Sequence, residues 1–389
     1  MTLLIFIVIL SLLVFVHELG HFLVAKKMKM YVEEFGFGLP PRIWGKKIGE
    51  TIYSINALPI GGFVKLYGES GQEAEKGSSL YGSLAVKGKA YFDKPIWQRL
   101  AVLLAGVTMN LFLAIISFTV IYFVLGVPTK LGRVKIEGIV QGSPAQAAQL
   151  KIDDVIVAVD SRKIKTTDEF IAITKKLSGQ KMILEISRKN DNPCKTGSDK
   201  NVLGGMAVGQ FGFSCNGENL LISVIPRKNP PVDEGPLGIA ISDTELKKYP
   251  FYLMPIYGAV EGLRESVSWG KQILSSLKSM IVTLVFKGQF PKDIAGPIGI
   301  FQVTGQVAKA GNLALLQFLG ILSVNLAIMN VLPFPALDGG RIVFLAYEVV
   351  TRKKASAKVE MIVNNIGMAI LLGLMVLITV NDIIRLVSR

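Results

Sequence analysis

The residues with the clearest chemical potential are His17, Glu18 and His21, in the run His-Glu-Leu-Gly-His. Positions i and i+4 of a helix share one face, so two imidazoles can bind one zinc ion while the Glu reaches its bound water. These are the only histidines in the chain, and they lie inside an apolar stretch. Ionisable residues are costly there and generally mark function. The pattern predicts a catalytic metal site, and the alternative is a structural His and Glu cluster without metal.

The third metal ligand is not given by the same motif. A catalytic zinc site normally has three protein ligands and one open position. Because the chain has no third histidine, the remaining ligand must be a carboxylate or a thiolate. Asp338 is the candidate, since it follows an apolar stretch and a turn containing Pro333 and Pro335, which break a helix. The alternative is that Asp338 only caps a helix in a Pro- and Gly-rich turn.

Composition indicates which elements must position these side chains. The chain has 389 residues, 50% of them hydrophobic, and its mean hydropathy of +0.47 is too high for an ordinary soluble enzyme. Four stretches are long enough to cross a bilayer of about 30 Å. They are Thr2 to Ala25, Ile96 to Val127, Asn312 to Leu332, and Met361 to Val380. Residues 1–16 carry no positive charge and no small-x-small site follows, which favours a retained span over a cleaved signal peptide.

The formal charge of +14 is distributed according to membrane topology. Lys and Arg crowd after the first stretch, before the second, and between the third and fourth, so we expect no nucleic-acid partner. By the positive-inside rule these places are cytoplasmic. The termini and the region between the second and third stretches are then extracytoplasmic. His21 and Asp338 should meet at one leaflet, while Cys194 and Cys215, on the other side, are excluded as ligands.

Three segments outside the spans have their own patterns. Residues 51–66 alternate around a Pro and a Gly pair, which is typical of a hairpin, either re-entrant beside the site or on the surface. Residues 131–243 form a soluble α/β module, with strands expected at 155–159, 182–187 and 220–225 and a helix near 168–177. Residues 245–286 are amphipathic and too polar to cross, which predicts a helix at the outer membrane interface.

Cys194 and Cys215 are the only cysteines, and both lie in a Gly- and Asn-rich insertion of the soluble module. In an oxidising compartment this arrangement favours a disulfide. Two reduced thiols are the alternative, since spacing alone does not establish pairing geometry.

Together, several runs resemble the site-2 protease family, and in particular its regulator-of-sigma-E protease branch. The matching runs are HELGH at 17–21, FGFG at 35–38, LPIGGFVKL at 58–66, GPIGIF at 296–301 and NLAIMNVLPFPALDGGR at 325–341. The run at 106–110 resembles the family's Gly-Pro-x-x-Asn element, with Val107 where Pro is usual.

The resemblance implies one zinc ion per chain, held by His17, His21 and Asp338, with Glu18 as general base. It also implies residues that hold the substrate as an extended strand, and two Asn side chains that line the cleft near it. The strand residues are Leu58, Pro59, Ile60, Gly61, Gly62, Phe63, Val64 and Lys65, and the Asn residues are Asn325 and Asn330.

The soluble module resembles a single PDZ domain of the bacterial, circularly permuted kind. The resemblance rests on the runs at 140–150 and 153–156 and on a closing strand at 237–241. It implies a ligand strand at Leu237, Gly238 and Ile239, with a newly formed C-terminus as the ligand.

The expected architecture is a multi-pass α-helical membrane protein with four transmembrane helices, a re-entrant β-hairpin and an extracytoplasmic PDZ-like α/β domain. We expect membrane halves at 1–127 and 301–389, the PDZ-like domain at 128–243, and an interfacial helix and linker at 244–300.

The expected function is intramembrane zinc-dependent hydrolysis of peptide bonds in lipid-embedded, single-span substrates of the bacterial inner membrane. The resemblance implies anti-sigma factors, already shortened outside during a stress response, and remnant signal peptides. A membrane-anchored PDZ scaffold with structural or no zinc is one alternative. A transporter with a His and Glu proton relay is another, although the spans show no inverted repeat.

Overall fold

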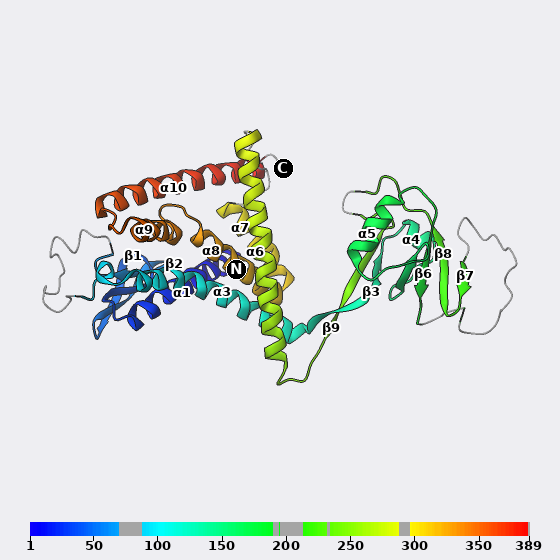
Figure 1. The fold of residues 1–389 in the computed structure, drawn as a ribbon, viewed down its shortest axis with the longest axis horizontal. Helices are drawn as coiled ribbons and strands as arrows, with labels where there is room; N and C mark the ends of the chain where they lie inside the picture. The colour runs from blue at the N-terminus through cyan, green and yellow to red at the C-terminus, as the bar shows by residue number, and fades with distance from the viewer. Residues whose placement is uncertain (70–87, 190–193, 195–212, 232–233, 288–295, 388–389) are drawn as a thin grey trace. The chain divides into compact units, whose positions relative to one another are not determined.

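The structure, a computed structural model, describes residues 1–69, 88–189, 194, 213–231, 234–287 and 296–387 (Figure 1). The chain divides into two compact units. The first consists of Met1–Val124 and Pro250–Arg389, and the second of Leu125–Tyr249.

Helices dominate the first unit. They are α1 (Thr2–Lys27), η1 (Tyr91–Asp93), α3 (Ile96–Leu125), α6 (Met254–Lys287), α7 (Pro297–Ala310), α8 (Asn312–Val331), α9 (Asp338–Thr351) and α10 (Ala357–Val387). Within the described residues, four are long and apolar enough to cross a membrane: α1, α3, α8 and residues 358–384 of α10. These are the four predicted spans. The 14-residue helices α7 and α9 were not predicted, because they are too short to be recognised as spans.

Helix α6 differs from the spans in direction as well as composition. Figure 1 shows α1, α3 and α10 running in a similar direction, with α6 crossing them. Gly258 and Gly262 of α6 lie against α3, where an added methyl group would be 3.2 Å from Thr119 O and 2.8 Å from Ile115 O respectively. The prediction that this helix begins at 245 is wrong, because residues 239–247 form a strand of the second unit.

The first unit also contains a two-stranded sheet of β1 (Val32–Ile48) and β2 (Thr51–Leu66). The start of β1 lies between the halves of β2: residues 34–37 lie opposite both 52–55 and 62–65. The predicted hairpin within 51–66 is thus one bent strand, because β1 separates its halves. Phe35 of β1 stacks on Phe22 of α1, with ring centroids 4.7 Å apart, which fixes the sheet to the end of the first helix.

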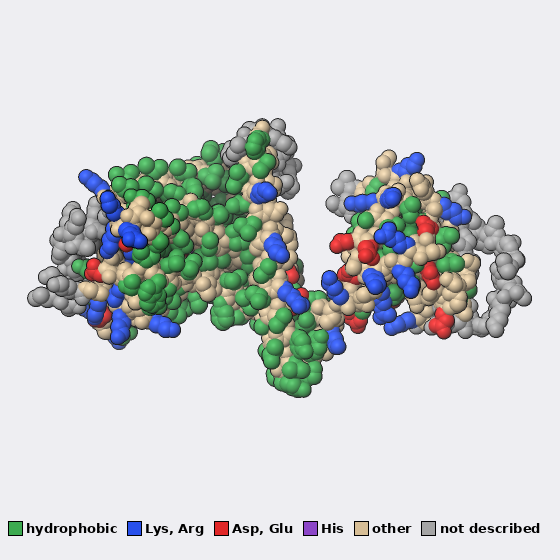
Figure 2. All heavy atoms as spheres, in the orientation of Figure 1, with side chains coloured by type: hydrophobic (Ala, Val, Ile, Leu, Met, Phe, Trp, Pro, Cys, Tyr) green, Lys and Arg blue, Asp and Glu red, His purple; other side chains and the backbone are tan. Residues whose placement is uncertain are grey.

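The helices of the first unit and the end that holds its two-stranded sheet differ in the types of side chain on their surfaces. Figure 2 shows hydrophobic side chains over most of its helices, a group of Lys and Arg at the end that holds β1 and β2, and further Lys and Arg spaced along α6. The structure therefore clusters the basic residues that the positive-inside rule uses.

In its described residues, the second unit is a seven-stranded sheet with two helices, α4 (Pro144–Ala147) and α5 (Thr167–Lys176). Its strands are β3 (Val127–Ile139), β4 (Val155–Val159), β5 (Arg162–Lys163), β6 (Met182–Ser187), β7 (Phe213–Asn216), β8 (Asn219–Val224) and β9 (Ile239–Lys247). The order is β7-β8-β6-β4-β3-β9, with β5 paired to β4. The predicted strands correspond to β4, β6 and β8, and the predicted helix is α5.

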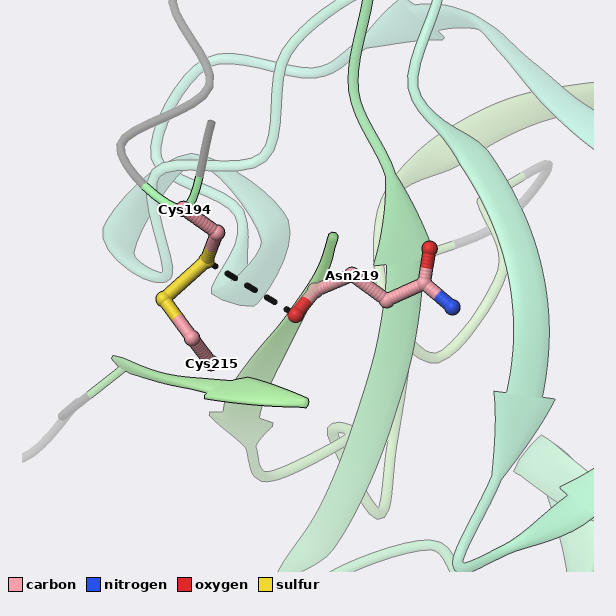
Figure 3. Close-up of a disulfide and its surroundings, with 3 residues drawn as sticks. All are labelled: Cys194, Cys215 and Asn219. Carbon is pink, nitrogen blue, oxygen red and sulfur yellow. Dashed lines mark hydrogen bonds between the residues drawn. A yellow bond between two sulfur atoms is a disulfide. The ribbon is translucent and has the colours of Figure 1, made fainter. Parts of the chain in front are cut away.

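A disulfide joins Cys194 to Cys215, with Cα atoms 5.8 Å apart (Figure 3). This is the pairing that the sequence favoured. Cys194 Sγ lies 3.7 Å from Asn219 O of β8, so the bridge is held against the sheet (Figure 3). Residues 195–212 of the predicted insertion lie outside the described part of the chain.

Candidate metal and catalytic site

Two glycines bring α1 and α3 into close contact beside the histidines. A methyl group on Gly20 would lie 2.4 Å from Ala105 O, and one on Gly106 would lie 2.4 Å from His21 Nε2. Small residues allow this approach between apolar helices. One consequence is that His21 Nδ1 lies 2.8 Å from Val102 O. A carbonyl oxygen only accepts hydrogen bonds, so Nδ1 carries the proton and Nε2 is left free for a metal.

Asp338 is positioned by the turn that follows α8. It is the first residue of α9. Methyl groups on the next two residues would lie 2.0 Å from Leu332 O, for Gly339, and 2.5 Å from Phe334 O, for Gly340. The Gly pair therefore lets α9 start directly against the end of α8. Of the two readings of Asp338 from the sequence, the ligand reading agrees with the structure, because the carboxylate faces the histidines. The cap reading is wrong, because the N-cap of α9 is Leu337 and no side chain caps this helix.

Three atoms form a compact triangle: His17 Nε2, His21 Nε2 and Asp338 Oδ2. The histidine nitrogens are 3.1 Å apart, and Asp338 Oδ2 lies 3.1 Å from His17 Nε2 and 3.3 Å from His21 Nε2. Ligand atoms around a tetrahedral zinc ion are separated by roughly 3.3 Å. Asp338 Oδ2 is buried and accepts no hydrogen bond of normal geometry within the described residues. Three potential ligand atoms that converge at these distances fit a bound cation.

The charge of Asp338 also suits a ligand. Burial alone would favour the neutral acid, but the nearby His17 and His21 rings lower the pKa of the Asp338 carboxyl to about 2. The carboxylate is therefore ionised at neutral pH, as metal binding requires.

Glu18 lies between the metal ligands and strand β2. Its Oε2 accepts a hydrogen bond from Val64 N at 3.1 Å. Glu18, His21, Val64 and Asp338 line one cavity of about 370 Å³, which extends to Arg341 and to Asn364 of α10. Water and a peptide carbonyl can reach the ligands and the base together only through such a space. Arg341, which forms an ion pair with Glu69, was not singled out by the sequence motifs.

Two Asn side chains contact His17, and only one was predicted to lie near the site. Asn330 Nδ2 lies 3.3 Å from His17 Nε2, and Asn110 Nδ2 lies 3.2 Å from His17 Nδ1. Asn325 lies instead in a groove with Trp269 and Gln272 of α6. The Gly106 and Asn110 spacing, one helical turn, was the available signal for the second contact.

The residues predicted to hold substrate lie along the second half of β2. Leu58 is 51% exposed, whereas Gly61 and Gly62 are buried near α1. Gly61 has φ +82°, and a methyl group there would be 3.2 Å from Val14 Cγ1. Ser11 Oγ donates to Pro59 O, so this part of β2 follows α1 toward the site.

Four apolar helices, with two His and an adjacent Glu on the first of them and an Asp at the start of α9, define a multi-pass membrane metalloprotease with a zinc site. The family model described as Peptidase family M50 matches residues 5–374, and the chain belongs to this family.

Similar proteins extend over the same length. A protein of Clostridium perfringens is 36% identical over 96% of both chains. The zinc metalloprotease RasP of Geobacillus kaustophilus is 30% identical over 97% of this chain and 96% of its own. The regulator of sigma-W protease RasP of Bacillus subtilis is 29% identical over 99% of both.

Proposed function

We propose that this zinc metalloprotease cleaves single-span membrane proteins within their lipid-embedded segments. The observation that carries the proposal is the position of the general base: Glu18 lies beside the metal ligands on an apolar helix and contacts the backbone of β2. A site built at the end of a spanning helix is suited to a substrate that arrives from the bilayer.

Glu18 is proposed to move the protons of the reaction. Zinc, when bound, supplies a Lewis acid that activates water and polarises the scissile carbonyl. Glu18 takes the proton of the attacking water and delivers it to the leaving amine. His17, His21 and Asp338 hold the ion, and Asn330 lies close enough to His17 to contact a peptide beside it.

Strand β2 is proposed to hold the substrate. A helical substrate hides its carbonyls in hydrogen bonds, so one segment must unwind before cleavage. The Val64 N–H points at Glu18 rather than into the β1 ladder. Substrate could add here as a strand, with main-chain hydrogen bonds positioning one peptide bond beside Glu18.

Substitution of the base tests the proposal. Purified Glu18→Gln and the unsubstituted protein are compared on a single-span substrate reconstituted in vesicles. The amide keeps the shape but cannot take a proton, so cleavage should fall by about 10²–10⁴-fold while zinc content stays the same. Unchanged cleavage would rule the mechanism out. A hydroxamate should inhibit the unsubstituted protein, whereas a closed four-ligand scaffold site would leave no position for it.

The proposed substrates are membrane proteins already shortened outside the membrane, of the anti-sigma factor type, and remnant signal peptides. This is supported by the similarity to RasP of Bacillus subtilis, which is named a regulator of sigma-W protease. Mass spectrometry of membranes from cells with the unsubstituted protein or the Glu18→Gln protein would identify the fragments that accumulate. If none accumulates, this substrate class is wrong.

The second unit is proposed to be a PDZ-like domain in the extracytoplasmic compartment. Strand β9 is at the edge of its sheet, and Thr167 N at the start of α5 donates to Asp243 Oδ2 of β9. A peptide C-terminus could add beside Ile239. The carbonyls of Leu237 and Gly238 are already used by Ala145 N and Val140 N. Binding of C-terminal peptides should be lost on Ile239→Asp, and unchanged binding would exclude this edge.

A further inference from the structure

The ring nitrogens of His17 and His21 that face away from the metal site need hydrogen-bond acceptors. In both residues Nε2 belongs to the ligand triangle. A neutral imidazole that binds metal through Nε2 carries its proton on Nδ1, and that N–H is normally held by an acceptor. His21 has one, Val102 O of α3, at 2.8 Å.

For His17 the group in the corresponding place is the Asn110 side chain. Asn110 is fully buried, and its Nδ2 lies 3.2 Å from His17 Nδ1. Its Oδ1 is buried and has no hydrogen-bond partner among the described residues. When Nε2 binds a metal and Nδ1 carries the proton, the amide as placed sets a donor against a donor, while its acceptor is unused.

Rotation of the amide by half a turn places Oδ1 toward His17 and moves Nδ2 to the position that Oδ1 leaves. The oxygen and nitrogen of an Asn amide have nearly the same shape, so they are assigned from their hydrogen bonds. With Oδ1 toward His17, Nδ1–H has its acceptor and Asn110 Oδ1 is satisfied.

Asn330 does not serve this purpose. Its Nδ2 lies 3.5 Å from His17 Nδ1 and 3.3 Å from His17 Nε2. An acceptor in line with the Nδ1–H bond would be much farther from Nε2 than from Nδ1. Asn110 is therefore the side chain that matches the direction of this proton.

We propose that Asn110 is a positioning residue for zinc, whose Oδ1 accepts the His17 Nδ1–H hydrogen bond and so presents Nε2 to the metal. Helix α3 then serves both histidines at intervals of four residues. Val102 O holds His21, Asn110 holds His17, and Gly106 between them leaves room for both rings. The inference rests on the zinc site of the proposed protease, and its test is metal binding, so it can fail while the proteolytic function stands.

Three variants of the full-length protein test this role: Asn110→Leu, Asn110→Asp and Ser323→Ala. Zinc affinity is measured by competition with a chromophoric chelator. The Leu variant removes the acceptor and should weaken zinc binding about 10–100-fold. The Asp variant has only acceptor oxygens and should bind at least as tightly as the unsubstituted protein. Ser323 is a matched control, since it is fully buried and donates to Asn110 O at 2.7 Å without touching a ligand. Its variant should bind zinc normally.

Histidine-selective ¹⁵N labelling gives a second, direct readout, because the chain has only two histidines. In the zinc-loaded protein both rings should be protonated at Nδ1, each with a hydrogen-bonded proton at low field. The His17 signal should lose that shift in Asn110→Leu and keep it in Asn110→Asp, while the His21 signal stays in place.

Unchanged zinc affinity in Asn110→Leu would overturn the proposal. So would an Asn110→Asp protein that binds as weakly as Asn110→Leu, because the amide nitrogen would then be the group that His17 needs. If the Leu variant does not fold, the Asp variant and the His17 signal still decide.

Discussion

Gly106 and Gly339 have no chemistry of their own, yet both are needed where a metal ligand is placed. Each lies where a side chain would occupy space that the site uses: His21 Nε2 beside Gly106, and the carbonyl of Leu332 beside Gly339. At the scale of single residues, the site depends on the absence of side chains as much as on its ligands.

Gly106→Ala should therefore abolish zinc binding. The added methyl group would lie 2.4 Å from His21 Nε2 and 2.6 Å from His17 Cε1, so at least one ring must move. Metal content measured by mass spectrometry checks this. Gly373→Ala in α10 is the matched control, since a methyl group there meets nothing within 4 Å. A Gly106→Ala protein with one zinc ion per chain would contradict the structure.

At the scale of elements, β2 and α9 bring distant parts of the chain to α1. The Val64 N–H on β2 reaches Glu18, while α9 starts with Asp338 and is held at a later turn by an ion pair to α3. Each element therefore combines a role in the site with a separate anchor.

Val64→Pro tests the edge of β2. Proline removes the N–H that points at Glu18, and it is tolerated in strands where no ladder hydrogen bond is lost. This N–H holds Glu18 in the structure and is the edge donor proposed for the substrate strand, so loss of one such hydrogen bond should lower kcat/KM about tenfold. Val64→Ala keeps the N–H and should retain activity. Equal cleavage by the two variants at equal zinc content would remove the edge from the proposed mechanism.

The ion pair between Arg99 of α3 and Glu348 of α9 should make the first unit more stable than a variant that lacks only one of the two partners. Arg99 Nη2 lies 2.7 Å from Glu348 Oε1, and the Arg99 side chain is only 2% exposed. Removal of one partner leaves a buried charge, which costs about 3–5 kcal/mol. Arg99→Met should lower unfolding stability strongly, and adding Glu348→Leu should recover most of the loss. If the double variant is no more stable than the single one, the pair is not the cause.

At the scale of the whole molecule, the chain separates a membrane unit from a sheet domain with its own core. The core of the second unit includes Val134, Ile156, Leu184 and Val224, each at most 1% exposed. Because this core is independent, effects on the two units can be measured separately.

The disulfide should stabilise the second unit. Cys194 and Cys215 are 21 positions apart, and closing a loop of this length contributes about 3 kcal/mol. The Cys194→Ser, Cys215→Ser protein should have a lower unfolding temperature for this unit. Its zinc content and the unfolding temperature of the first unit should stay the same. Equal stability with and without reductant would contradict this.

Membrane topology can be tested by labelling intact spheroplasts with an impermeant maleimide, in the background without native cysteines. Lys165→Cys in the second unit should react, because that unit is proposed to be extracytoplasmic. Arg352→Cys, just after α9, should react only after permeabilisation, because the positive-inside rule puts it in the cytoplasm. The opposite pattern would invert the topology. Both residues are exposed in the structure.

The sequence by itself determined the features that depend on local periodicity. Four apolar stretches predicted the spans, and the four-residue spacing of His17 and His21 predicted two ligands on one helical face. Helical geometry could also have separated Asn325 from Asn330, because five positions along a helix turn by about 140°. Only the second lies beside His17.

Only the tertiary structure decided which distant groups meet. Asp338 remained either a cap or a ligand until α9 was seen to begin against the histidines. The carbonyl of Val102 has no sequence signature, since every residue has one, and its role depends on how closely α1 and α3 pack. The two halves of β2 were predicted to pair with each other, but β1 lies between them. Contacts between segments far apart in the chain depend on packing, which local patterns do not encode.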